Sequence, residues 1–448
     1  MSRTPVGEGS VGISPTVGRG AGPVAEQRRR IRHGAEALAG KNVLFFSVSY
    51  RPEHAGIGPY ATATAERLAD EGAHVTVVAG LPHYPSWRLA AGDRWRLRRD
   101  EDAGGLRVVR LRQIVPRRQT ALSRCLYELT FLLHGVLARK TWERPDVVVA
   151  VTPSLAGAIL GKLAARRYGV PLVVIVQDLV SAGAMQSGMG GGRLVSALLG
   201  RVEARLLRGV QALGLAHDSF VQPCLRMGVD RANVHVVPNW SLREPPDTSA
   251  TPLKSGWSGR FVVLHAGNMG FKQGLEVAVE AARLADAAGE SDLLFVLMGD
   301  GNRRDTLAPM AHGIPTIQII DPVSDESFPA ALAAADVLLV TQRAEVHDMS
   351  VPSKLTAYFN AGRPIVCSAS SAGGTADEVT RSGAGLLVPA QDAQALLDAV
   401  LELRRSPALS ESLGRSGQAY SREHLSATVG LERVVALVSA GLRTVASR

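Results

Sequence analysis

The sequence predicts an α/β protein made of two doubly wound domains, each built on a parallel sheet. Short β-branched runs alternate with amphipathic helical stretches from Asn42 onward. The alternation stops in a segment rich in Pro, Ser and Thr, residues 241–259, and then restarts. Such alternation is typical of a parallel sheet with helices on both faces. The 448 residues suit two domains and a tail, at roughly 100 to 200 residues per domain.

We expect five parts along the chain. Residues 1–40 are rich in Gly, Pro and Arg, and they are expected to be a disordered basic tail or residues ahead of the native start. A first domain is expected at 41–240, a linker at 241–259 and a second domain at 260–424. Residues 425–448 are expected to form a last helix that packs back toward the first domain.

In the first domain, strands are expected where short runs of Val, Ile and Leu are bounded by turn or charged residues. Helices are expected where apolar residues recur every three or four positions. The expected strands are 42–48, 74–79, 106–111, 146–151, 171–176 and 234–237, and the expected helices are 57–71, 121–138, 155–168 and 192–207.

The same rules apply to the second domain. The expected strands are 261–265, 293–298, 316–320, 337–341, 364–368 and 385–388, and the expected helices are 273–288, 303–310, 326–335, 354–361, one near Ala376, 393–404 and 425–442. In open parallel sheets, ligands bind at the carboxyl ends of the strands. The cleft between two such domains is therefore the expected active site.

Composition excludes several classes of protein. Hydrophobic residues at 46% and charged residues at 20% are close to globular averages, so wholesale disorder is excluded. The longest run without a charged residue has 16 residues (72–87), below the ~18 to 20 of a membrane-spanning helix. We therefore expect no span and a cytosolic protein. Three distant cysteines and eleven histidines without metal-ligand spacing predict neither a disulfide framework nor a metal site.

Positive charge is concentrated in the first half of the chain. Residues 1–250 carry 33 Lys and Arg against 20 Asp and Glu, a net +13, while residues 251–448 carry 17 against 21, a net −4. This asymmetry suggests that one domain faces an anionic partner. Because the basic residues are not interleaved with aromatic ones, anionic membrane lipid or a phosphate-bearing substrate fits at least as well as nucleic acid, and we expect no nucleic-acid partner.

Gly56 and Gly58 precede the first expected helix in a G-x-G-x-x-A pattern. A nicotinamide cofactor is disfavoured because the loop before them, residues 49–55, is too long for the tight turn that the motif needs. The second strand also ends in Ala79-Gly80, where a ribose-binding carboxylate should stand. Two interpretations remain: backbone that approaches a ligand phosphate or sugar, and a plain flexible loop.

The segment HAGNMGFKQG, residues 265–274, follows the first strand of the second domain. Its glycines surround Lys272, which favours a turn that cradles a phosphate with the lysine as a point charge. A solvated lysine at a helix start is an equally good interpretation.

Lys354 lies in the first turn of an expected helix, within the sequence VPSKL (351–355). Pro352 and Ser353 are ordinary helix-start residues. A lysine at the positive end of a helix dipole is unfavourable, and it becomes favourable when an anion binds there. Asp178 ends a strongly apolar strand at the expected cleft, where it is either a ligand contact or the cap of the next loop.

The expected helix 121–138 carries five leucines, at positions 122, 126, 129, 133 and 137, on one stripe. Arginines lie around it and upstream of it, so the stripe could lie on an anionic membrane surface. Packing of the helix on its own sheet is the commoner arrangement.

Together, these motifs resemble the retaining family-4 glycosyltransferases of GT-B fold, in which two Rossmann-like domains face an interdomain cleft. The most similar subgroup builds colanic acid, O-antigen and other bacterial exopolysaccharides. The resemblance covers nearly the whole chain from about residue 42, and it rests on residues 46–88, IVQD (175–178), PNW (238–240), HAGNMGFKQG (265–274), GDG (299–301), TQR (341–343), VPSKL (351–355) and AGRPIV (361–366).

The resemblance implies a UDP- or GDP-sugar donor held mainly by the second domain and transfer with retention. It implies a polyprenyl-diphosphate-linked saccharide acceptor held by the first domain, and neither a cofactor nor an obligatory metal. The implied catalytic residues are Asp178, Lys272 and Lys354; the implied donor contacts are Gly56, Gly58, Gly267, Asn268, Lys272, Val323, Pro352, Ser353 and Lys354; and the implied acceptor or cleft residues are Glu53, His83 and Asp178.

This sequence departs from the family pattern at three places. Ala357 stands where many members have the second glutamate of an E-x7-E pair, which holds the ribose, and Met349 stands at the first position. Asn268 replaces an arginine, and residues 151–154 (VTPS) lack a histidine that many members carry. The ribose contact and the catalytic base are therefore unassigned.

The leading hypothesis is a cytosolic glycosyltransferase of cell-surface polysaccharide synthesis that docks on the inner face of the plasma membrane. The competing hypothesis is a non-catalytic, nucleotide-sugar-binding scaffold that partners another transferase, which Ala357 and the missing histidine favour. A third hypothesis is a sugar-nucleotide epimerase on the same fold, which no feature of the sequence favours.

Overall fold

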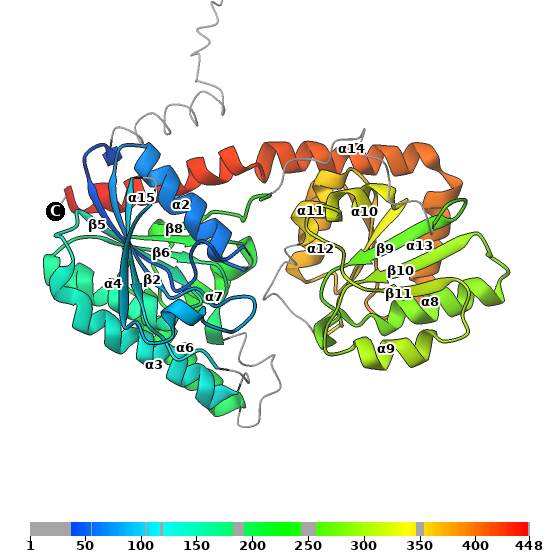
Figure 1. Ribbon diagram of the computed structural model, residues 1–448. Helices are drawn as coiled ribbons and strands as arrows, with labels where there is room; N and C mark the ends of the chain where they lie inside the picture. The colour runs from blue at the N-terminus through cyan, green and yellow to red at the C-terminus, as the bar shows by residue number, and fades with distance from the viewer. Residues whose placement is uncertain are drawn as a thin grey trace, which may run out of the picture.

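Two parallel sheets dominate the computed structural model, which describes residues 37–54, 56–103, 105–116, 120–181, 192–242, 257–345 and 354–446 (Figure 1). Within these residues, the first sheet has eight strands in the order β3-β4-β2-β1-β5-β6-β7-β8. Its strands are β1 Asn42–Phe46, β2 His74–Gly80, β3 Arg98–Ala103, β4 Leu106–Leu111, β5 Val147–Thr152, β6 Leu172–Val176, β7 Ala212–Leu215 and β8 Val234–Val236. The described pairs are parallel except β3 with β4, which is antiparallel.

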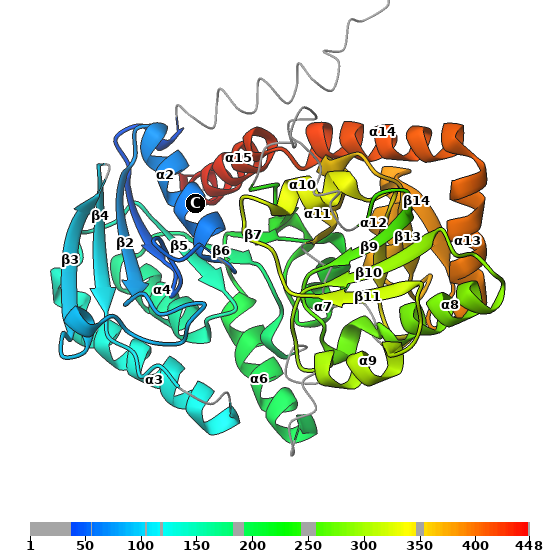
Figure 2. The same ribbon diagram turned by 45° about the vertical axis from the view of Figure 1, so that its right-hand side comes forward.

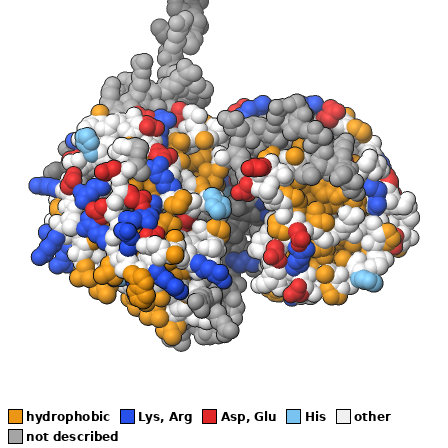
Figure 3. Space-filling model, viewed as in Figure 1, with side chains coloured by type: hydrophobic (Ala, Val, Ile, Leu, Met, Phe, Trp, Pro, Cys, Tyr) orange, Lys and Arg blue, Asp and Glu red, His pale blue; other side chains and the backbone are white. Residues whose placement is uncertain are grey.

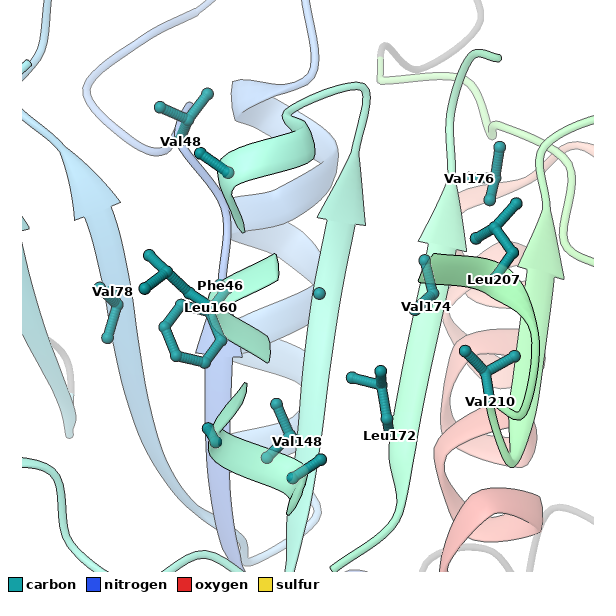
Figure 4. Packing of buried hydrophobic residues seen from close by; sticks show 14 of the residues in the cluster. Phe46, Val48, Val78, Val148, Leu160, Leu172, Val174, Val176, Leu207 and Val210 are labelled. Carbon is teal, nitrogen blue, oxygen red and sulfur yellow. The ribbon is translucent and has the colours of Figure 1, made fainter. Parts of the chain in front are cut away.

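Helices cover both faces of the first sheet, because its central strands are apolar on both sides. Every residue of β5 is buried, for example. Figure 4 shows Leu160 of α4 packed against Phe46 of β1, and burial of such a side chain contributes roughly 1.5–3 kcal/mol. The main helices of this domain are α2 Gly58–Asp70, α3 Ala121–Ala138, α4 Leu155–Tyr168, α6 Gly192–Leu207 and α7 Val221–Arg226.

The second described sheet has six strands, all parallel, in the order β11-β10-β9-β12-β13-β14. The strands are β9 Phe261–Ala266, β10 Leu293–Met298, β11 Ile317–Ile320, β12 Val337–Thr341, β13 Ile365–Ser368 and β14 Gly385–Val388. The helices are α8 Glu276–Ala287, α9 Arg304–Ala311, α10 Phe328–Ala334, α11 Lys354–Ala361, α12 Gly374–Ser382 and α13 Ala393–Arg405. The predicted α/β class with two doubly wound sheets is thus confirmed.

Two C-terminal helices connect the domains. Helix α14 (Pro407–His424) packs along α11 and α13 of the second domain, and α15 (Ala427–Ala446) runs over to β5, β6 and β7 of the first (Figures 1 and 2). The stretch Pro407–Thr444 is long and apolar enough to cross a membrane by composition. Leu437 and Val438 of α15 are nevertheless fully buried in the first domain, so we interpret α15 as a core helix.

Helix α3 packs on its own domain, but not through the leucine stripe. Tyr127 and Phe131 point into the core, beside Leu160 of α4. The five leucines at 122, 126, 129, 133 and 137 are between 42% and 73% exposed. Figure 3 shows hydrophobic side chains along the lower edge of this domain, where α3 lies. The helix therefore has two apolar faces, and one of them is uncovered.

Four described strands and α-helices were not expected from the sequence: β3, β7, the short helix α7 and α14. Strand β3 (RRDEDA) has no apolar pattern; it forms by antiparallel pairing with β4 and is supported by ion pairs such as Arg110–Glu101. Strand β7 has only four residues, too few for a periodicity signal. Helix α14 begins at Pro407 directly after α13, and its polar, Gly-containing sequence has a weak pattern.

Candidate active site

The carboxyl edge of the second sheet contains a glycine-rich turn that follows β9. Gly267 has a φ of 131° and Gly299, which follows β10, has a φ of 149°. A Cβ atom on Gly299 would lie 1.9 Å from the carbonyl oxygen of Gly267, so a side chain cannot be accommodated there. The amide of Met269 donates a hydrogen bond to the carbonyl of Asp300 at 2.8 Å, which locks the two strand ends together. The turn is therefore rigid backbone with little side-chain cover.

Lys354, the first residue of α11, lies beneath this turn. The Nζ of Lys354 donates a hydrogen bond to Nε2 of His265 at 3.2 Å. A Cβ on Gly267 would lie 3.5 Å from this Nζ. Burial lowers the pKa of Lys354 to about 7. Burial, followed by the Lys354 charge, also holds the pKa of His265 well below its usual range, so His265 is the neutral acceptor. An anion bound at this helix start would restore the lysine charge.

Lys272 of the second domain and Asp178 of the first domain lie close enough for each charge to affect the pKa of the other. Lys272 lies in the short 3₁₀ turn Phe271–Gln273, and burial lowers the pKa of Lys272 while the charge of Asp178 opposes that shift. Burial raises the pKa of Asp178 to about 6. The hydrogen bond from the Leu179 amide and the charge of Lys272 act in the opposite direction and lower it. A carboxyl from the first domain thus faces a lysine from the second.

The Asp178 loop is held by Glu203, a buried residue of α6. The carboxylate of Glu203 accepts hydrogen bonds from the amides of Val180 at 2.8 Å and Ser181 at 3.2 Å, and from the Ser181 hydroxyl. The hydroxyl of Thr152 donates to the carbonyl of Asp178 at 3.4 Å. These contacts fix the backbone of the loop, so that Asp178 lines the cavity between the domains.

A cavity of about 140 Å³ lies between the domains beside Asp178. One wall of this cavity is formed by Glu378 of α12 and its three polar partners. Glu378 accepts hydrogen bonds from Tyr420 at 2.9 Å and from Arg381 at 2.8 Å. Its carboxylate also lies 3.4 Å from Nε2 of His217. Arg381 also pairs with Asp218 of the first domain. Although burial opposes it, hydrogen bonds from His217 and Tyr420 lower the pKa of Glu378. Glu378 is therefore an ionised junction between the domains.

In the first domain, Glu53, His83, Gly56 and Gly58 form a separate cluster. Oε1 of Glu53 accepts hydrogen bonds from the amides of His83 and Tyr84, both at 3.0 Å. Gly58 is required because a Cβ there would lie 2.7 Å from the Glu53 carbonyl, and Gly56 has a φ of 64° beside Tyr84. Glu53 and His83 are only 5% and 4% exposed. They join two loops and present little surface to a ligand, so a direct acceptor contact by either is not supported.

The other predicted donor contacts are scattered. Asn268 is exposed next to the glycine turn, and Val323 is half-buried after β11. Pro352, Ser353 and Met349 lie outside the described residues. Among the side chains that the structure does describe, no group of three His, Cys, Asp or Glu is placed to hold a metal ion.

Sequence reasoning missed His265, His217, Glu378 and Arg381. His265 did leave a signal, because a histidine at the end of the apolar strand FVVLHA needs a partner when it is buried. The other three carried none: His217 follows the short β7, and its contact with Glu378 spans 161 positions of sequence.

Comparisons with known proteins agree with this geometry. A family model described as "Glycosyl transferase 4-like domain" matches residues 55–240, and one described as "Glycosyl transferases group 1" matches residues 260–406. WcaI of Escherichia coli K12, named as a glycosyl transferase of colanic acid biosynthesis, is 30% identical over 343 residues, which cover 73% of this chain and 83% of WcaI. The chain belongs to the family-4 glycosyltransferases of GT-B fold. The resemblance to the exopolysaccharide subgroup is confirmed as well.

Solved structures show the same GT-B fold. Sucrose-phosphate synthase from Thermosynechococcus elongatus superposes with a TM-score of 0.67 and 17% identity, over 87% of this chain and 96% of that one. Anabaena HepE in complex with UDP-glucose superposes with a TM-score of 0.61 and 15% identity, over 91% of this chain and 100% of that one.

For this family-4 glycosyltransferase we expect the binding of an anion beside Lys354 to be accompanied by proton uptake. Above pH 7 the Lys354 amine is largely neutral in the free protein, and a bound diphosphate should raise its pKa toward the ordinary value. Lys272 should act in the same direction. His265 stays neutral throughout, because its pKa is far below this range.

Calorimetric titration with UDP at pH 8.5, in buffers of different ionisation enthalpy, measures this uptake. We expect an uptake approaching one proton per site at pH 8.5 and a much smaller one near pH 6. Lys354→Gln should remove most of it. The same proton count at both pH values would contradict an anion site at Lys354.

Proposed function

We propose that this glycosyltransferase moves a sugar from a UDP- or GDP-sugar, with retention at the anomeric carbon, to a polyprenyl-diphosphate-linked saccharide in cell-surface polysaccharide synthesis. The observation that carries the proposal is the pair of partly desolvated lysines at the carboxyl edge of the second sheet. Lys354 lies under the glycine turn and Lys272 faces Asp178 across the cleft.

The proposed chemistry uses the diphosphate as the leaving group. Negative charge develops on the diphosphate as the glycosidic bond breaks, and two lysines beside a helix start stabilise that charge. The leaving diphosphate would accept the proton of the acceptor hydroxyl on the same face, which gives retention. The protein then contributes orientation and charge stabilisation. Activity without an obligatory metal belongs to this proposal, and turnover should survive EDTA.

The proposal places the protein at the inner face of the membrane, with α3 as the contact surface. The uncovered leucine stripe supplies apolar area, and Arg124, Arg139 and Lys140 supply positive charge. An acceptor carried on a polyprenyl chain stays in the bilayer, so a transferase that lies on the bilayer meets it at high local concentration. An amphipathic helix with these features binds anionic interfaces.

A panel of UDP- and GDP-sugars, each offered with a polyprenyl-diphosphate-linked saccharide, tests the function. The expected result is turnover with at least one donor and a product of the donor's anomeric configuration. Donor binding without hydrolysis or transfer across the whole panel would instead support the non-catalytic scaffold.

We expect Ala357→Glu to weaken nucleotide binding by a factor of several and to lower the melting temperature. Ala357 is half-buried against the apolar core of the second domain, where a carboxylate would lose part of its hydration. It also lies three residues after Lys354 on α11, so a new carboxylate would neutralise the lysine that we assign to the diphosphate.

Titration calorimetry and thermal unfolding of Ala357→Glu and Ala357→Gln check this expectation. The glutamine variant controls for size and should bind more tightly than the glutamate variant. Tighter binding by Ala357→Glu at unchanged stability would show that the pocket keeps the family's usual ribose position.

A further inference from the structure

A second concave site lies between α4 and α6 of the first domain. The groove measures about 240 Å³ and is away from Asp178 and the two lysines of the cleft. Ile159 and Leu163 of α4, with Val202 and Leu206 of α6, form its apolar lining. The other lining side chains are basic: Lys162, Arg166 and Arg205. None of the described residues that line it is acidic.

The three cations crowd one another without a carboxylate between them. Burial lowers the pKa of Lys162, and the charges of Arg166 and Arg205 lower it further. Lys162 is engaged, because its Nζ donates to the carbonyls of Leu206 and Arg208 at 3.0 Å each, at the end of α6. Arg166 and Arg205 are exposed, and within the described part of the chain neither forms an ion pair. Like charges held together at a concave surface favour an anion there.

The neighbouring acidic side chains point elsewhere. Glu203 of α6 is buried and holds the Asp178 loop. Glu128 of α3 caps α4, where its Oε2 accepts from the Ala156 amide at 2.8 Å. The solvent side of these helices is thus basic and apolar.

The groove is also continuous with the α3 surface. Helix α3 packs against α4, and α4 packs against α6, so the three helices form one layer (Figure 2). Gly135 allows the close approach of α3, because a Cβ there would lie 2.3 Å from Leu160. Leu163 and Leu198 are exposed on α4 and α6, beyond the stripe of α3. A bilayer that contacts α3 would meet this groove.

We propose that the groove binds an anionic phospholipid of the bilayer, with part of one acyl chain along the apolar lining and the phosphate on Arg166 and Arg205. Arginine suits this role because its planar fork donates two hydrogen bonds to phosphate oxygens. This inference rests on the proposed docking of α3 for its membrane setting. It adds a discrete lipid site to what is otherwise an unspecific surface contact.

The test uses dihexanoyl-phosphatidylglycerol below its micelle concentration, so that binding is measured without a bilayer. Calorimetry should show saturable binding to the full-length protein, and Arg166→Gln with Arg205→Gln should weaken it at least ~10-fold, as loss of charge-assisted bonds predicts. The matched control is Arg167→Gln, a neighbour on α4 whose guanidinium stacks on Tyr168 and does not line the groove. The control should bind like the wild type. Thermal unfolding must show that all variants remain folded.

Several outcomes would overturn the lipid site. Inorganic phosphate that binds as tightly as the lipid would show an anion patch without a chain site, and an equal loss in Arg167→Gln would show a general charge effect. Wild-type affinity in the double variant would also reject it. The α3 variant Leu129→Asn with Leu133→Asn should keep short-chain binding. If that variant and the wild type bind vesicles equally, the α3 docking fails while the groove stands.

Discussion

Lys354→Ala is expected to lower kcat/KM at least ~100-fold, and Lys272→Ala should have an effect of similar size. Each substitution removes a positive charge that we assign to the leaving diphosphate, and loss of one such transition-state contact costs about 3 kcal/mol. Lys354 should show the larger loss, because it is more deeply buried and contacts both the glycine turn and His265.

Steady-state kinetics with the best donor, together with UDP affinity, separate the two roles of these lysines. A fall in kcat indicates charge stabilised in the transition state, and a rise in KM alone indicates ground-state binding. Lys41→Ala is the matched control, since Lys41 is a partly exposed lysine beside Asp146, at the opposite end of a strand from the cleft. Near-normal turnover in both cleft variants would refute the donor assignment.

The second large effect concerns membrane binding. The wild type should float with phosphatidylglycerol vesicles at low salt and be released near 0.5 M salt, where the Debye length is about 4 Å. Leu129→Asn with Leu133→Asn should lower the partition coefficient at least ~10-fold. Each leucine would bury its exposed half in the bilayer for about 1 kcal/mol, and an amide in its place adds a desolvation cost.

Flotation on anionic and neutral vesicles measures both parts of this expectation. Leu387→Asn, at an exposed leucine of the second domain, is the control and should float like the wild type. Equal partitioning onto neutral and anionic vesicles would mean that charge has no part in the binding. Unchanged flotation of the α3 variant would mean that its leucines face solvent without a membrane role.

The local period of apolar residues was enough to predict several of the helices and strands that carry the site residues. The expected bounds of α3, α4, α11, β10 and β12 are those of the structure, because each has a clear apolar period between turn residues or caps. Lys354 was identified in the same way, as a cation at the wrong end of a helix dipole. The family follows from motifs of this local kind, since glycine turns and helix starts are contiguous in sequence.

Contacts between distant segments were decided by the tertiary structure alone. His265 meets Lys354 across 89 positions and His217 meets Glu378 across 161, and no period or motif encodes such a pairing. Glu53 shows the converse, because its place in a motif suggested a ligand contact, whereas burial turned it into a link between two loops.

Helix α3 shows what the sequence determines and what only the tertiary structure determines. By itself, the sequence determined an 18-residue helix with a leucine stripe, because the period of apolar side chains is a local property. It could not determine which apolar face would be covered, since Tyr127 and Phe131 form a second such face. The tertiary structure determines it, because α4 packs closely against α3 at Gly135, where the absence of a side chain permits the approach. The leucine stripe on the other face is therefore left uncovered.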